Sequence, residues 1–372
     1  MTTLRKSKFS ATVVAAAALI LAACSSGSSD EASSASVDPN VDITTQKLVI
    51  SNWAGYYPED LAAKVKEAIG VDITITNHAT NEEIMGKLTA SDDSGIDVAF
   101  VSGQYAQALA SGGKIVNFDK SLIPNLANYY PVVSELAYDK GTNYSAPYAW
   151  GTTGLCYRSD LIDFTPDSWN DLLNPKDSVK GKTTMLATER WLALPALKLL
   201  GYSINTTNSD EIAKAKEQLI KTKPTLLAYD DTAFYTKLVS GEAVLTEAWD
   251  GWCNYGIAEN PNIKFVIPKE GSDLWADTMV ILSSSKNKEA AHAFINYILQ
   301  PDVHAWVANN ILYKVPNKAA TETLDPALVT SYPNMGLSPA DLLKGEVVVD
   351  LGADSKLYTD LATEVKIGRA HV

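Results

Sequence analysis

A tryptophan and a carboxylate stand two residues apart in the stretch Lys269 to Thr278, at Trp275 and Asp277. In an extended segment, residues two apart share a face. A small organic cation could then contact the indole face through a cation-π interaction and the carboxylate through a charge-assisted hydrogen bond. The alternative interpretation places Trp275 in the core and Asp277 at the start of a strand. The other residues of the chain are needed to distinguish these two interpretations.

Apolar runs alternate with amphipathic segments from residue 47 onward. Their hydrophobic periodicity predicts strands at 48–51, 71–75 and 96–101 and helices at 61–69 and 81–88. Strand-helix units that follow one another in this way predict a mostly parallel sheet flanked by helices. In such a sheet, ligands bind beyond the carboxyl ends of the strands.

The loops after these strands contain aromatic and neutral polar side chains. Trp53 and Tyr56 follow the first strand, and Ser102 and Gln104 follow the third. No nucleophile stands beside a partner base in these loops, which favours binding over covalent catalysis. The sequence has no Gly-x-Ser-x-Gly motif and no histidines at metal-ligand spacing. We therefore expect no enzyme, no metal site and no cofactor.

The extended stretch Tyr144 to Gly154 is interpreted as a strand that crosses between two lobes. A second series of strands and helices follows it, between Thr183 and Ala248, and includes a predicted strand at 226–229. The predicted fold class is therefore α/β with two lobes, each a mostly parallel sheet flanked by helices, joined by crossing hinge strands. The predicted division assigns 47–150 and 276–321 to lobe 1, and 151–275 and 322–365 to lobe 2.

The N-terminal segment predicts export and attachment to a membrane. A basic start precedes an apolar run that is too short to span a bilayer, which is typical of a secretory signal over residues 1–23. The run ends Leu-Ala-Ala-Cys at Cys24, which resembles a lipobox, the bacterial motif whose cysteine is acylated. Residues 24–46 are rich in serine, alanine and aspartate, which predicts a flexible tether. We expect an extracytoplasmic protein held at the cell membrane by lipid on Cys24.

The charge of the chain limits its partners. Removal of residues 1–23 takes away three basic side chains and no acidic one, so the formal net charge goes from -13 to -16. A strongly acidic surface disfavours nucleic acid and anionic lipid as partners and favours a positively charged ligand. The other interpretation is that the acidity serves only solubility.

Two cysteines remain once Cys24 is acylated. Cys156 and Cys253 could pair outside the cytoplasm, but without distance information we favour two buried thiols. The last seven residues, 366–372, read Lys-Ile-Gly-Arg-Ala-His-Val and are interpreted as a non-native tail. No function is assigned to them.

Seven short stretches carry a resemblance to a known family through their order and spacing. They are Ser51–Trp53, Ser145–Gly151, Leu200–Ser203, Ile267–Gly271, Asn287–Ala290, Leu299–Val303 and Tyr313–Ala320. Together they resemble the spermidine/putrescine-binding proteins of bacterial ABC importers, which have the type 2 periplasmic binding fold.

The resemblance implies a monomer whose interlobe cleft binds a small cationic amine and whose partners are an ABC permease and a cytoplasmic ATPase. It also implies an aromatic wall of Trp53, Tyr56, Trp249, Trp275 and Tyr313. Ser102 would supply a hydroxyl, and Asp277 would bind an ammonium group.

The chain also departs from the family pattern. The acidic positions that hold the ligand's second amine fall on Thr188 and Trp191, with Glu189 close by as a possible substitute, and Gln104 stands where the family has an aromatic ring. Asp277 is thus the one carboxylate of the family site that this sequence keeps. Spermidine, putrescine and a single quaternary or primary amine all fit, and a sugar or an amino acid in the same fold remains an alternative.

Overall fold

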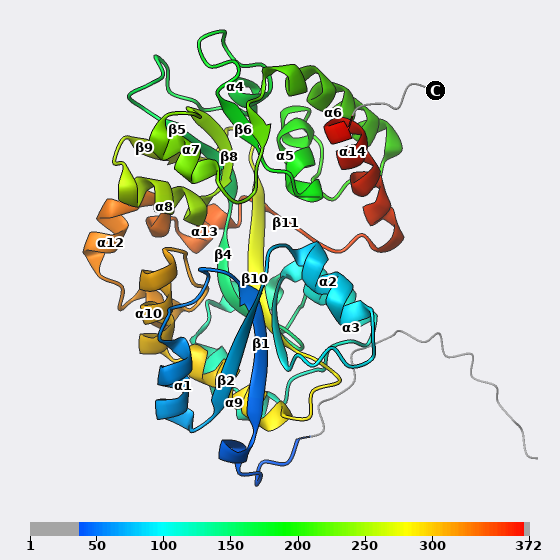
Figure 1. Cartoon of the computed structure of the whole chain (residues 1–372), viewed down its shortest axis with the longest axis vertical. Coiled ribbons are helices and arrows are strands. Elements are labelled where there is room, and N and C mark those ends of the chain that lie inside the picture. Colours follow the sequence, from blue (N-terminus) through cyan, green and yellow to red (C-terminus); the bar gives the residue numbers. More distant parts are fainter. Residues whose placement is uncertain (1–36, 368–372) are drawn as a thin grey trace, which may run out of the picture.

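The computed structural model describes residues 37–367. Two α/β lobes lie one above the other in Figure 1, and strand β10 (Asp273–Ile281) runs between them. Each lobe is built on one sheet with helices beside it. The two-lobed α/β fold predicted from the sequence is confirmed, while the exact division between lobes stays a prediction.

Six strands form the sheet of lobe 1. With β10 they are β1 (Lys47–Trp53), β2 (Asp72–His78), β3 (Val98–Ser102), β4 (Ala146–Gly151) and β11 (Glu346–Val347). Strand β1 is parallel to β2 and β3, whereas β10 is antiparallel to β3 and β4. The sheet is more mixed than the sequence predicts, because β4 and β10 cross between lobes and belong to no strand-helix unit.

The helices of lobe 1 lie beside its sheet. They are α1 (Leu61–Ile69), α2 (Asn81–Thr89), α3 (Gly103–Ser111), α9 (Lys288–Ile298), α10 (Pro301–Ile311) and α11 (Lys318–Thr321). Helix α1 ends at Gly70, whose φ of +73° suits glycine. Helix α2 begins after Thr80, whose hydroxyl accepts the N–H of Glu83 at 3.1 Å. The Thr80 cap fixes the loop that follows β2.

Lobe 2 is built on a five-stranded sheet in the order β7-β6-β8-β5-β9. The strands are β5 (Thr153–Arg158), β6 (Thr183–Met185), β7 (Ala228–Tyr229), β8 (Leu245–Trp249) and β9 (Ile263–Val266). The helices are α4 (Trp169–Leu173), α5 (Glu189–Leu199), α6 (Ser209–Thr222), α7 (Phe234–Ser240), α8 (Asp250–Glu259) and α14 (Lys356–Ile367). Two short helices, α12 (Pro326–Ser331) and α13 (Pro339–Leu342), precede β11.

The two cysteines of lobe 2 form a disulfide. Cys156 lies on β5 and Cys253 on α8, and their Cα atoms are 5.9 Å apart. The prediction of two buried thiols was therefore wrong. The error has a physical cause, because the residues are 97 positions apart and only the packing of α8 against β5 brings them together.

The hinge is closely packed where β4 leads into β5. The side chain of Asp273 accepts hydrogen bonds from the N–H of Thr153 at 2.7 Å and from its hydroxyl at 3.0 Å, which ties the start of β10 to β5. Gly151 leaves no room for a side chain, since a Cβ atom there would lie 2.3 Å from both Asp250 and Trp275. The hinge thus holds the Trp275 indole close to the backbone.

The chain ends differ from the predicted tether and tail. Ile43–Thr45 form a short 3-10 helix, and Gln46 donates to Glu289 on α9 at 2.8 Å, so the last part of residues 24–46 packs on the folded body. Helix α14 continues to Ile367, into the predicted tail. The signal segment and Cys24 lie outside the described residues. Among the helices of residues 37–367, none combines the length and apolar character needed to cross a membrane.

Candidate functional site

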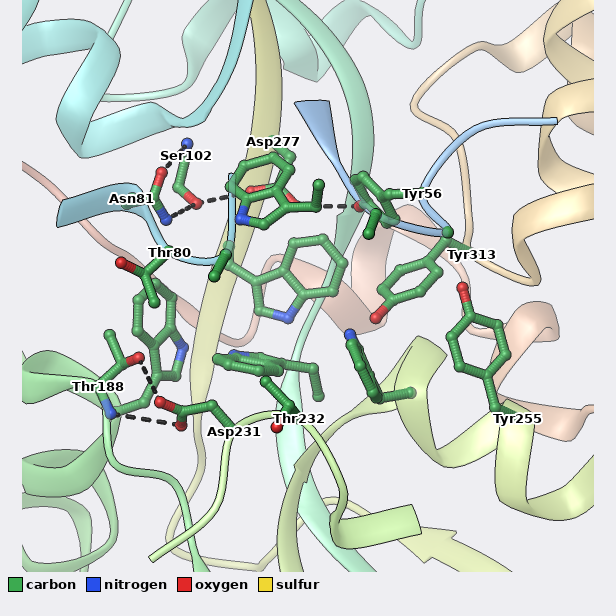
Figure 2. A pocket seen from close by; sticks show the side chains of 18 of the residues that line it. Tyr56, Thr80, Asn81, Ser102, Thr188, Asp231, Thr232, Tyr255, Asp277 and Tyr313 are labelled. Carbon is green, nitrogen blue, oxygen red and sulfur yellow. Dashed lines mark hydrogen bonds between the residues drawn. The ribbon is translucent and has the colours of Figure 1, made fainter. Parts of the chain in front are cut away.

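A pocket of about 260 Å³ lies between the lobes (Figure 2). Lobe 1 contributes the loops after β1, β2 and β3, and lobe 2 contributes the start of α5, the loop between β7 and α7, and α8. The lining residues are Trp53, Ala54, Gly55, Tyr56, Ala79, Thr80, Asn81, Glu82, Ser102, Thr188, Trp191, Asp231, Thr232, Tyr235, Trp249, Trp252, Tyr255, Trp275, Asp277 and Tyr313.

Asp277 is held at the pocket wall by a hydrogen-bond network. It lies opposite Ser102 in the register of β10 with β3. The Ser102 hydroxyl donates to its Oδ1 at 2.6 Å, and the Tyr56 hydroxyl donates to its Oδ2 at 2.9 Å. Asn81 in turn holds Ser102, because its Nδ2 donates to the Ser102 hydroxyl at 3.0 Å. Figure 2 shows these side chains gathered on one side of the pocket.

The charge of Asp277 has no cationic partner among residues 37–367. None of the ion pairs there includes it. Burial raises the pKa of this carboxyl to about 6, against the hydrogen bonds from Ser102 and Tyr56, which lower the pKa. A desolvated carboxylate that faces a pocket is stabilised most by a cation, which would restore the interaction lost with water.

The aromatic side chains predicted for the site come together. Trp275 is 3% exposed, its ring lies 5.7 Å from that of Tyr313, and both line the pocket. Trp53 and Tyr56 meet edge to face at 5.6 Å. Trp249 lines the lobe 2 side. Trp275 is therefore buried in the hinge, as the alternative interpretation predicts, and it also forms part of the pocket wall. Asp277 lies inside β10 and not at its start. Contact of this ring and this carboxylate with a cation stays a prediction.

The structure adds aromatic rings that the sequence analysis did not select. Tyr235 on α7 and Trp252 and Tyr255 on α8 also line the pocket, and the Tyr255 ring lies 6.1 Å from that of Tyr313. Trp252 and Tyr255 are three residues apart, a spacing that places them on one helix face. That spacing was visible in the sequence, but which face looks into the cleft depends on how α8 packs.

One of the two positions mapped to family carboxylates supplies an indole. Trp191 lines the pocket, and its Nε1 donates to the buried Asp273 carboxylate at 2.7 Å. Burial raises the pKa of Asp273 to about 6, although its hydrogen bonds with Thr153, Trp191 and Ser272 oppose the shift. Asp273 thus holds the Trp191 ring in place through this hydrogen bond.

Two carboxylates that were not selected from the sequence also line the pocket, Glu82 on α2 and Asp231 in the loop after β7. The signal for Asp231 was its place two residues after the predicted strand that ends at Tyr229. Two predicted residues do not line the pocket. Gln104 is buried in the first turn of α3, and Glu189 accepts a hydrogen bond from Thr359 at 2.8 Å. Their contact with a ligand stays a prediction.

A pocket enclosed by two lobes on crossing hinge strands, with aromatic walls and uncompensated carboxylates, defines the class of solute-binding proteins. Comparisons with known proteins agree. The sequence pattern of the family described as bacterial extracellular solute-binding protein matches residues 60–336. The chain belongs to this family, which consists of binding proteins and not of enzymes.

Relatives in the family cover most of the chain. The spermidine/putrescine-binding periplasmic protein of Escherichia coli K12 is 32% identical over 91% of this chain and 95% of its own length. A structure of a Listeria monocytogenes protein assigned to spermidine/putrescine ABC transport has a TM-score of 0.81 at 29% identity, covering 87% of this chain and 99% of that one. The structure of the spermidine/putrescine ABC transporter substrate-binding protein of Streptococcus pneumoniae has a TM-score of 0.75 at 26% identity, and it covers 87% of this chain and 99% of that one. The family resemblance recognised in the sequence is confirmed.

Proposed function

We propose that this protein captures a small cationic amine outside the cytoplasm and delivers it to an ABC permease driven by a cytoplasmic ATPase. The observation that carries the proposal is Asp277, a desolvated carboxylate in an aromatic pocket that forms no ion pair within residues 37–367. The names of the relatives, which bind spermidine and putrescine, support the same ligand class. Acylation of Cys24 would keep the protein at the membrane beside the permease.

Capture requires that the ligand contacts both lobes. Trp53, Tyr56 and Asp277 would contact it from lobe 1 and the hinge, and Trp249 from lobe 2. A ligand can favour the closed arrangement only by as much as it binds that arrangement better than the open one. Contacts from two lobes provide this difference in affinity.

A thermal-shift screen of the mature protein against polyamines, quaternary amines, amino acids and sugars tests the proposal. A ligand at about a hundredfold its dissociation constant adds about 2.7 kcal/mol to the free energy of unfolding, so binding is easily seen. We expect stabilisation by spermidine or putrescine. Stabilisation by sugars or amino acids alone would contradict the proposed ligand class.

The tryptophans should contribute to affinity through their ring faces. Replacing Trp53 or Trp249 by leucine is expected to weaken amine binding by about 0.5–2 kcal/mol each, because one cation-π contact is lost. Isothermal titration calorimetry measures the change. Trp306→Leu is the matched control, since this partly buried tryptophan lies outside the pocket. Equal losses in all three variants would point to general destabilisation.

Affinity for the amine should fall in acid. The ligand requires the ionised form of Asp277, whose pKa is about 6 in the free protein, whereas the amine stays protonated throughout. Affinity is therefore expected to be constant above about pH 7 and to fall about tenfold per pH unit well below pH 6. Calorimetry between these pH values tests this, and an affinity that does not change down to pH 5 would contradict it.

The same shift in pKa acts oppositely on the stability of the free protein. Folding raises the pKa of Asp277 from 3.8 to about 6, so the folded state binds this proton more tightly than the unfolded chain. The resulting stabilisation is fully present below pH 3.8 and is lost as the pH rises through 6. Bound amine should reverse this trend.

A further inference from the structure

Asp231 is fixed at the pocket wall by hydrogen bonds from a neighbouring loop. Its Oδ1 accepts the N–H groups of Ala187 at 2.7 Å and Thr188 at 3.3 Å, and its Oδ2 accepts the Thr188 hydroxyl at 3.0 Å. These bonds join the loop after β7 to the loop before α5. Burial nevertheless raises the pKa of Asp231. None of the ion pairs among residues 37–367 includes this carboxylate.

Glu82 reaches the same pocket from the other lobe. It stands in the first turn of α2, and its Oε1 accepts a hydrogen bond from the Tyr105 hydroxyl. The charge of Glu82 contributes to the raised pKa of Asp231, so the two carboxylates interact across the gap between the lobes. Like charges brought together by closure repel each other unless a cation lies between them.

Asp231 lies away from Asp277. Figure 2 shows Asp277 with Ser102 on one side of the pocket and Asp231 with Thr188 on the opposite side, with indole rings between them.

We propose that Asp231 and Glu82 form a second cation subsite and that the ligand is an elongated amine with a positive charge at each end. This deepens the proposed function and rests on it. Asp277 holds one ammonium group, the indoles cover the apolar chain, and the second ammonium group lies between Asp231 and Glu82. Because these two residues come from different lobes, the second charge also favours closure.

A subsite at Asp231 accounts for the missing family carboxylate at Thr188. The family position that would hold a carboxylate has a hydroxyl here, and this hydroxyl binds Asp231 from the neighbouring loop. The negative charge is therefore supplied to the pocket by another segment.

Two ligands of equal chain length test the subsite: putrescine, with an ammonium group at each end, and butylamine, with only one. We expect wild-type protein to bind putrescine more tightly. In Asp231→Asn the affinity for putrescine should fall by at least about tenfold while that for butylamine stays unchanged, because only the charged hydrogen bond to the second ammonium is lost. Calorimetry, with competition for the weaker ligand, gives both constants.

Glu82→Gln provides a second variant at an independent position. It should also lower the preference for putrescine over butylamine, and it leaves the loop after β7 unchanged. Glu67→Gln is the matched control, because it removes one charge from an exposed position on α1, another helix of lobe 1, outside the pocket. An unchanged preference for putrescine in both pocket variants, or an equal loss of both ligands, overturns the subsite. Wild-type protein that binds neither amine overturns the proposed function itself.

Discussion

Replacing Asp277 by asparagine should lower the affinity for a cationic amine by about 2–5 kcal/mol, which is roughly 30-fold to several thousandfold. The variant keeps the size of the side chain and an oxygen that can accept from Ser102 or Tyr56, so the fold should be retained. What it removes is the negative charge in a pocket with little water, where an unpaired ammonium group is costly. Calorimetry with putrescine and spermidine measures the loss.

Asp302→Asn is the matched control for this experiment. Asp302 is a carboxylate near the start of α10, outside the pocket, and its removal should leave affinity unchanged. Butylamine should lose affinity in Asp277→Asn as well, in contrast to the selective loss expected for Asp231→Asn. If Asp277→Asn kept wild-type affinity for every amine, the role of this carboxylate would be refuted.

Removing the disulfide with Cys156→Ala and Cys253→Ala should lower the free energy of unfolding by about 2–5 kcal/mol. The bond joins residues 97 positions apart, so it closes a long loop and restricts the unfolded chain strongly. Urea denaturation followed by tryptophan fluorescence measures the change. A disulfide is also expected to persist outside the cytoplasm, which agrees with the predicted export.

Wild-type protein treated with a reducing agent separates the bond from the packing of the two buried sulfur atoms. Reduced wild type and the double alanine variant should show similar losses, because the crosslink is absent from both. Amine affinity should change little while lobe 2 remains folded, since neither cysteine lines the pocket. Equal unfolding midpoints for oxidised and reduced wild type would contradict a stabilising disulfide.

Much of the site could be predicted because it obeys local rules. Trp53, Tyr56 and Ser102 follow strands of the expected sheet, and loops at the carboxyl ends of strands meet in space. Trp275 and Asp277 are two apart on a strand, which fixes their relative orientation. The same loop rule would have identified Asp231, because it follows the predicted strand that ends at Tyr229 by two residues.

Other features depended on contacts that no local pattern encodes. Glu82 is one of many acidic residues on helix surfaces, and only the approach of lobe 2 distinguishes it. Tyr235 belongs to the site because α7 and α8 pack together beside the hinge. The buried ion pair between Lys314 and Asp250 likewise joins segments far apart in the chain.

Trp275 and Asp277 depend both on the local sequence and on the tertiary structure. The sequence by itself determined the α/β class, two lobes, the aromatic character of the cleft and one carboxylate of the pocket, because hydrophobic periodicity and family spacing can be read along the chain. Only the tertiary structure decided that Cys156 and Cys253 pair and that Asp231 and Glu82 face the same pocket. Those contacts depend on distances between segments, which are set when the lobes pack and close.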